Sequence, residues 1–172
     1  MGHVSRRDVI RLTRTVSFAI LNSIMLLLSP VARALWSVDF HPDCETWADD
    51  LLQPDKEALL AAMRVLTSEG PTLGRPLVDT ITSSRHSNMK ELRPGSTGRT
   101  EIRVLFAFDK ERKAILLLGG DKTDDWTGWY ATNIPIADDR FDEHQATIAK
   151  ERDTLKTSSR TTKRSPKGKG RR

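Results

Sequence analysis

Three strand-like runs, close together in the middle of the chain, constrain the fold more than any other feature. They are NMKELRP (88–94), TEIRVLFAFD (100–109) and AILLLGGD (114–121). The tetrapeptide GSTG lies between the first two runs, and KERK lies between the last two. Short polar connections of this kind indicate hairpins, so we expect these runs to form a small antiparallel sheet.

The segments before the hairpins predict one more strand and two helices. LWSVDFH (35–41) alternates apolar and polar side chains, as a half-buried strand does. Asp43 is suited to cap a short helix over CETWADDLL (44–52), and a second helix follows from Pro54. The apolar stripe of this second helix consists of Leu59, Leu60, Met63 and Leu66. The turn-rich segment 71–87 is interpreted as a connection.

A last helix is expected to start after Pro135, with Ala137, Phe141 and His144 on one face. The order strand, helix, helix, three strands, helix predicts an α+β fold with a small antiparallel sheet. The two N-terminal helices would pack on one face of this sheet, and the other face would be free to bind a ligand.

Charge is distributed unevenly and suggests three segments. The net charge is +5, but residues 36–149 hold 13 basic and 20 acidic residues. Residues 150–172 hold ten Lys/Arg and two acids, with no apolar periodicity. We therefore expect a folded domain over 36–150 and a disordered basic tail over 151–172, which would add nonspecific affinity for nucleic acid.

Residues 1–35 form an arginine-rich leader with an apolar run. Five arginines accompany one aspartate, and the run from Val16 to Leu28 precedes small residues at Ala32 and Ala34. This pattern is typical of a secretory signal, and the run is short for a transmembrane helix. The alternative is an upstream extension from a start site assigned too early.

Cysteine and histidine usage argues against a disulfide framework and against a metal site. Cys44 is the only cysteine, and His3, His41, His86 and His144 are far apart in the sequence. We expect neither a metal nor a cofactor.

Alternation along TEIRVLFAFD assigns its side chains to two faces. The apolar core face consists of Ile102, Val104, Phe106 and Phe108. Arg103 lies on the other face, in the middle of a strand. A lone arginine in this position commonly forms an ion pair, here with Glu91 or Glu101.

A cluster of basic residues surrounds this position. Six of them fall within nineteen residues: Arg85, His86, Lys90, Arg93, Arg99 and Arg103. Lys122 and Tyr130 follow the last strand-like run. Cations bind phosphate and stabilise the charge that develops during its displacement, and aromatic rings stack on unpaired bases. The cluster therefore predicts a surface that handles RNA, with groups able to move a proton.

The region from residue 88 to residue 126 resembles the HigB-like branch of the RelE toxin superfamily. The most specific parts are MKELR (89–93), IRVLFAFD (102–109) and AILLLGGDKT (114–123), and the resemblance extends over about residues 36–150. Members of this family are small bacterial mRNA endonucleases that act on the ribosome and belong to toxin–antitoxin pairs. The resemblance implies a RelE-like fold with RNA cleavage on the concave side of the sheet.

The resemblance also implies roles for particular side chains. Those expected to be catalytic are Lys90, Arg103, Lys122 and Tyr130. Those expected to bind RNA are Arg93, Arg99, Asp121 and Trp126. Many relatives have a phenylalanine and paired lysines where this chain has Gly120-Asp121-Lys122, so Asp121 would act either as a base or as an ion-pair partner of Lys122. Packing is the alternative role for Trp126, and Gly119 and Gly120 are expected to let the strand end close to its neighbour.

The implied partners are a cognate helix-turn-helix antitoxin, operator DNA contacted through that antitoxin, and mRNA on the ribosome. The mature domain would not contact a membrane, and its location would be cytoplasmic unless residues 1–34 are a true signal. Two other functions stay open. One is a noncatalytic, degenerate toxin that binds nucleic acid or protein, and the other is an exported protein.

Overall fold

A computed structural model describes residues 36–95, 100–123, 125 and 128–162 of the chain. The leader over residues 1–35, Arg99, Trp126 and residues 163–172 lie outside the described residues. The elements are β1 (Ser37–Phe40), α3 (Pro42–Asp49), α4 (Gln53–Glu69), the 3₁₀ turn η1 (Gly70–Thr72), β2 (Val78–Thr80), β3 (Met89–Leu92), β4 (Ile102–Phe108), β5 (Lys113–Asp121) and α5 (Gly128–Thr162).

The five strands form one sheet in the order β1-β5-β4-β3-β2. The expected α+β class is confirmed, and the hairpins β3–β4 and β4–β5 are antiparallel as predicted. The sheet is nevertheless mixed, because β1 pairs with β5 in parallel. The predicted connection also contains a strand, β2, which pairs with β3. A strand of three residues within a turn-rich segment has too little alternation to be recognised.

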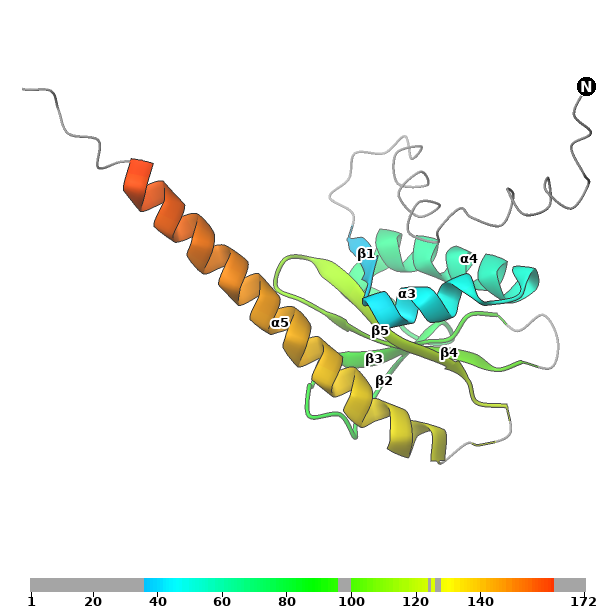
Figure 1. Cartoon of the computed structure of the whole chain (residues 1–172). Helices are drawn as coiled ribbons and strands as arrows, with labels where there is room; N and C mark the ends of the chain where they lie inside the picture. Colours follow the sequence, from blue (N-terminus) through cyan, green and yellow to red (C-terminus); the bar gives the residue numbers. More distant parts are fainter. Residues whose placement is uncertain (1–35, 96–99, 124, 126–127, 163–172) are drawn as a thin grey trace, which may run out of the picture.

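One face of the sheet carries the main core, beneath α3 and α4 (Figure 1). The predicted stripe of α4 is mostly buried, with Leu59, Met63 and Leu66 inaccessible to solvent. His41, not Asp43, caps α3, because its ring Nδ1 accepts a hydrogen bond from the Asp43 backbone N–H at 3.3 Å. The helices therefore bury one continuous apolar surface of the sheet, as amphipathic helices do.

The sequence suggested that the opposite face is free to bind a ligand. Instead, α5 packs across part of this face. A second apolar cluster joins the sheet to this helix, and its helical members are Trp129, Ile134, Ala137 and Phe141. The helix begins at Gly128, so Pro135 lies inside it instead of near its start. A proline inside a helix removes one backbone donor, and burial of Ile134 and Ala137 against the sheet offsets that loss.

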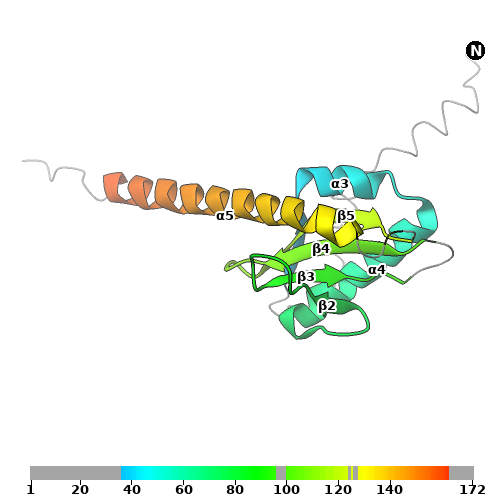
Figure 2. The same ribbon diagram turned by 90° about the horizontal axis from the view of Figure 1, so that it is seen from below.

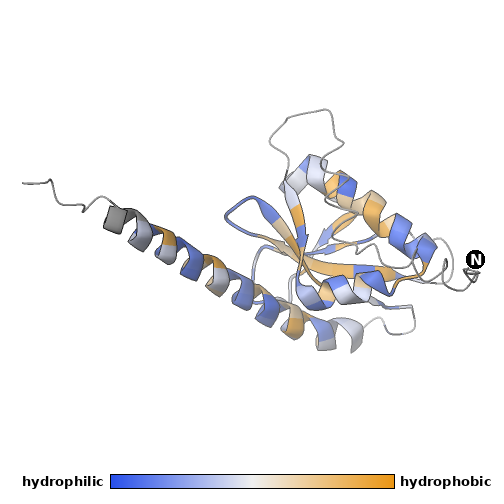
Figure 3. Cartoon of the chain, turned by 45° about the horizontal axis from the view of Figure 1, so that its top comes forward, coloured by the Kyte–Doolittle hydropathy of each residue, from blue (hydrophilic) through white to orange (hydrophobic). Residues whose placement is uncertain are grey.

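The far half of α5 projects beyond the sheet (Figures 1 and 2). Residues 151–162 are helical, which corrects the expectation that the tail is disordered from residue 151. Local contacts support the projecting part, which is mostly hydrophilic (Figure 3). Thr154 Oγ1 donates to the Lys150 carbonyl at 2.9 Å, and Arg152 Nε donates to Glu111 at 3.1 Å. Among the described residues, no helix is long and apolar enough to cross a membrane.

β5 contains a bulge and two glycines that determine how closely α3 and α5 approach the two faces of the sheet. Leu105 pairs with Leu118 and Phe106 pairs with Leu116, so Leu117 is the extra residue. A Cβ on Gly119 would lie 2.0 Å from the Trp47 ring of α3, and one on Gly120 would lie 2.8 Å from Trp129 Nε1 of α5. The glycines therefore do not end the strand; each makes room for a tryptophan.

Candidate functional site

The α5 face changes from apolar to charged towards one end of the sheet. Alternation places Glu91 of β3 on the same face as Met89, and Arg103 of β4 on the same face as Leu105. Lys122 follows β5, and Tyr130 lies in the first turn of α5. The ends of three neighbouring strands and the start of one helix thus bring ionisable groups to one edge of the apolar cluster.

Arg103 and Lys122 are buried cations that share one carboxylate. Arg103 is 8 % exposed and Lys122 is 1 % exposed. Arg103 Nη2 lies 3.4 Å and Lys122 Nζ lies 3.5 Å from Oε2 of Glu101. Glu101 is thus the ion-pair partner of Arg103, one of the two that the sequence suggested. Burying two cations so close together requires such compensation.

Tyr130 is held beside this group. Its hydroxyl donates a 2.6 Å hydrogen bond to Oε2 of Glu91, and Lys122 Nζ lies 5.6 Å from the centre of its ring. Burial and the Glu91 carboxylate raise the pKa of Tyr130 to about 12, against the opposing charges of Arg103 and Arg93. The phenol therefore stays protonated at neutral pH and is a hydrogen-bond donor.

A cleft of about 440 Å³ opens next to these residues. Its lining residues are Arg75, Pro76, Arg93, Pro94, Glu101 and Arg103. Three arginines thus meet at one concave surface, which is suited to an anion.

Acidic residues hold two of these arginines in place. Asp79 binds Arg75 and lies 3.7 Å from Arg93, and Arg93 Nε also lies 3.6 Å from Glu91. Burial disfavours ionisation of Asp79, but the hydrogen bonds from Arg75 and the Thr80 N–H, together with the charges of Arg75 and Arg93, outweigh it and lower the pKa of Asp79. Sequence reasoning missed Arg75 and Asp79, because both belong to the segment interpreted as a connection. The sequence LVDT (77–80), in which polar residues follow apolar ones, was the signal that could have indicated a strand here.

Lys90 does not join the cleft. It pairs with Phe106 in β4 and shares its face with Leu92, and both of these belong to the core under α3 and α4. The structure therefore places Lys90 and Arg103 on opposite faces of the sheet. The structure does not bring these two predicted site residues together, and the role of Lys90 stays a prediction. The face of each residue depends on the pairing register of the strands, which the sequence alone does not provide.

Asp121 links the end of β5 to the residue that precedes β4. Its Oδ1 accepts hydrogen bonds from the Glu101 N–H at 2.9 Å and from the Thr123 N–H at 3.0 Å. Burial opposes ionisation of Asp121, but these bonds and the Thr123 hydroxyl outweigh it and lower the pKa of Asp121. A carboxylate with this low basicity and these partners is suited to fixing the backbone.

Two members of the predicted basic cluster lie elsewhere. Arg85 binds Asp139 at 2.7 Å and Asp142 on α5, and His86 Nε2 lies 3.0 Å from Asp142. The buried Asp138 accepts a hydrogen bond from the Arg85 backbone N–H. This loop is thereby fastened to α5. Within the described parts of the chain, no group of His, Cys, Asp or Glu side chains could hold a metal ion.

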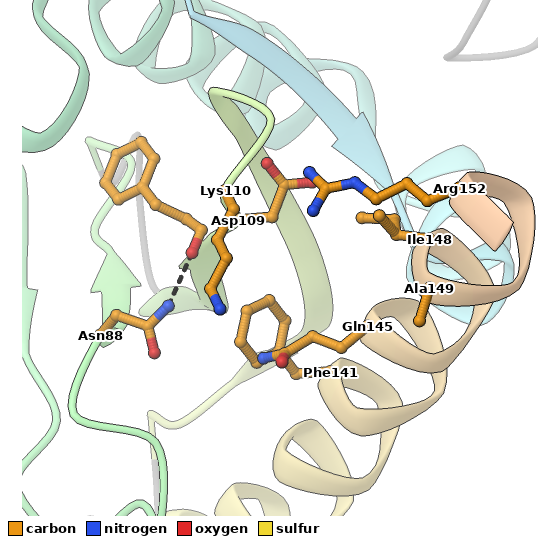
Figure 4. Close-up of a pocket in the computed structure, with 9 residues that line it drawn as sticks. Asn88, Asp109, Lys110, Phe141, Gln145, Ile148, Ala149 and Arg152 are labelled. Atoms are coloured by element: carbon orange, nitrogen blue, oxygen red, sulfur yellow. Dashed lines mark hydrogen bonds between the residues drawn. The ribbon is translucent and has the colours of Figure 1, made fainter. Parts of the chain in front are cut away.

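A second cavity of about 240 Å³ lies between α5 and the turn that joins β4 to β5 (Figure 4). Phe108, Phe141 and Ile148 contribute apolar surface, and Asn88 Nδ2 donates to the Phe108 carbonyl at 2.6 Å. None of the described residues predicted as site residues lines this cavity. The cleft beside Arg103 is therefore the candidate site.

Comparison with known proteins identifies the family. The family model described as "Phage derived protein Gp49-like (DUF891)" matches residues 46–142, more than half of the chain. The toxin candidate HigB2 of Mycobacterium tuberculosis is 46% identical over 138 residues, which cover 69% of each chain. The toxin candidate HigB3 of the same organism is 52% identical over 99 residues, covering 58% of this chain and 84% of HigB3.

The chain belongs to the phage-derived Gp49-like family, and its HigB2 and HigB3 relatives place it among the HigB-like toxins. A solved structure of an Escherichia coli RelE mutant in the free state is also similar, at 12% identity and a TM-score of 0.42. That similarity covers 53% of this chain and 87% of the RelE chain.

Proposed function

We propose that this protein is the toxin of a toxin–antitoxin pair and that it inhibits translation as a metal-independent endoribonuclease of mRNA on the ribosome. Family membership supports the toxin class. The observation that carries the chemistry is the cleft where Arg103, beside buried Lys122, meets Arg75 and Arg93. Preorganised cations in a partly dry site stabilise the charge that develops on a phosphodiester during cleavage.

Roles for individual residues follow from their surroundings. Arg103 and Lys122 would stabilise the pentacovalent phosphorane, and Arg93 would hold a neighbouring phosphate. Tyr130 would donate a hydrogen bond or a proton, because its raised pKa disfavours the phenolate. Lys90 is left out of this set because its side chain lies on the α4 face.

The same proposal includes partners. An antitoxin with a helix-turn-helix domain would hold the toxin inactive and contact operator DNA, and the toxin would act in the cytoplasm, where mRNA and ribosomes are. Co-purification of the full chain with the product of an adjacent helix-turn-helix gene tests this part.

The function is tested with full-length protein in a cell-free translation extract. We expect the wild type to stop translation and to produce discrete mRNA ends that primer extension can map. Arg103→Ala should reduce cleavage by about 10²–10³-fold, the usual loss for one transition-state donor.

Arg152→Ala is the matched control. It removes the same charge from the projecting part of α5, where Arg152 pairs with Glu111, so cleavage should be unchanged. If the wild type leaves mRNA intact in the presence of ribosomes, the endonuclease proposal fails. Binding of RNA without cleavage would instead identify a noncatalytic toxin-like binder.

A further inference from the structure

Arg103 has an unused donor beside the cleft. Its Nη1 donates to the Ile102 carbonyl at 2.7 Å, and its Nη2 makes a 3.4 Å contact with Glu101. Its Nε is shielded from solvent and has no hydrogen-bond partner among the residues that the structure describes. Buried guanidinium donors are normally paired, so this edge of the side chain has capacity for a further acceptor.

Glu101 is held loosely by the two cations that it neutralises. Its contacts with Arg103 and Lys122, at 3.4 and 3.5 Å, exceed the roughly 2.7–2.9 Å of a good charge-assisted hydrogen bond. Its side chain is 40 % exposed. Its backbone is fixed, because its N–H donates to Asp121 and to Thr123. The carboxylate is therefore able to move while the strand end stays in place.

We propose that Arg103 and Lys122 form a site for one phosphodiester group of single-stranded RNA, and that the Glu101 carboxylate occupies this site until RNA displaces it. A phosphate has oxygens for both Nε and Nη2 of Arg103, the bidentate geometry that a guanidinium favours. The inference deepens the proposed function, on which it rests, by naming an internal competitor for the substrate.

Glu101 has opposite effects in the two states of the protein. In the RNA-free state it compensates two buried cations that would otherwise repel each other. In the RNA-bound state it must leave, so the apparent affinity for RNA is reduced by the fraction of molecules in which it occupies the site. Its removal should therefore strengthen RNA binding, whereas removal of a carboxylate that positions RNA would weaken it.

The first test measures binding of a 2′-O-methyl RNA oligonucleotide, which resists cleavage, to the full chain. Glu101→Gln is expected to bind roughly 3- to 10-fold more tightly than the wild type. Glu111→Gln is the matched control, because it removes the same charge at the opposite end of β4, where Glu111 pairs with Arg152. Unchanged or weaker binding by Glu101→Gln, or equal tightening by both variants, overturns the inference.

The second test uses the wild type and so does not depend on the stability of Glu101→Gln. The Nε–H resonance of Arg103, assigned by its absence in Arg103→Lys, should shift on titration with the same oligonucleotide. No shift at saturation overturns the inference.

Neither measurement requires cleavage. Tighter binding by Glu101→Gln without cleavage by the wild type would contradict the endonuclease proposal and leave the phosphate site standing. Cleavage by the wild type with unaltered RNA binding by Glu101→Gln would overturn the inference about Glu101 and leave the endonuclease proposal standing.

Discussion

The two faces of the sheet are built by the same strands but have different compositions. The face under α3 and α4 is an apolar core shared by all five strands. The α5 face is apolar around Leu105 and Phe141 but charged around Glu91 and Arg103. Two helices seal the first face, whereas one helix covers only part of the second. The chain thus gathers the buried charges Glu91, Arg103 and Lys122 at the end of one face and obtains its stability mainly from the other.

The largest difference between the faces should appear in stability. Phe106 is fully buried in the α4-face core, so Phe106→Ala should lower the free energy of unfolding by about 3–5 kcal/mol. Arg103→Ala should cost less, because it also removes a buried charge. Urea unfolding followed by tryptophan fluorescence measures both. An equal loss for the two variants would break the contrast between the faces.

The two glycines of β5 test the faces one at a time. Gly119→Ala drives a methyl group into Trp47 and should cost about 1–3 kcal/mol, with a smaller cost for Gly120→Ala against Trp129. Gly74→Ala is the control, since nothing lies within 4 Å of its added Cβ. Of the three, only Gly120→Ala should reduce translation inhibition beyond its effect on stability, because Trp129 adjoins Tyr130.

Tyr130 reports on the charged end directly, as it is the only tyrosine in the chain. Its phenolate absorbance should appear at a midpoint near pH 12 in the folded protein and near pH 10 in denaturant. Between these values the unfolded chain has lost a proton that the folded chain retains, so stability should fall as pH rises. Tyr130→Phe should remove that part of the slope. A native midpoint near 10 would contradict the Glu91 hydrogen bond.

Lys90→Ala should have the smallest effect. Lys90 lies on the α4 face, half-buried at a position away from the cleft, so we expect a change of about 0.5 kcal/mol or less in stability. RNA binding should change less than about twofold, in contrast to Arg103→Ala. A loss of translation inhibition as large as that of Arg103→Ala would show that Lys90 reaches the substrate after all.

Most of the fold could be predicted from local patterns. The hairpins follow from alternation and short polar connections, and α4 follows from its stripe of leucines and Met63. The parallel pairing of β1 could not be predicted, because it depends on long-range contacts between residues 37–40 and 113–116. The start of α5 was misjudged because Pro135 looks like a first-turn residue when only local rules are applied.

The site was only partly accessible from sequence. Arg103 and Lys122 were recognisable as a mid-strand cation and a cation after the next strand, and the structure brings them together with Tyr130 around Glu101 and Glu91. Their roles stay predictions. Glu91 and Glu101 were both candidate partners of Arg103, and the sequence could not decide between them because ion pairing depends on side-chain positions in separate elements.

The extra residue at Leu117 has a consequence for how this family tolerates insertions and deletions. Up to Leu117 the odd-numbered residues of β5 face α5, and beyond it the even-numbered residues do. This change of phase places Gly119 against Trp47 and Gly120 against Trp129. A one-residue deletion there would leave a strand of nearly the same length and restore perfect alternation. Leu118 would still pair with Leu105, so Gly119 would keep its place against Trp47 and Gly120 its place against Trp129. The bulge is therefore a position in β5 where one residue can be lost without exchanging the faces of the strand end that leads to Lys122.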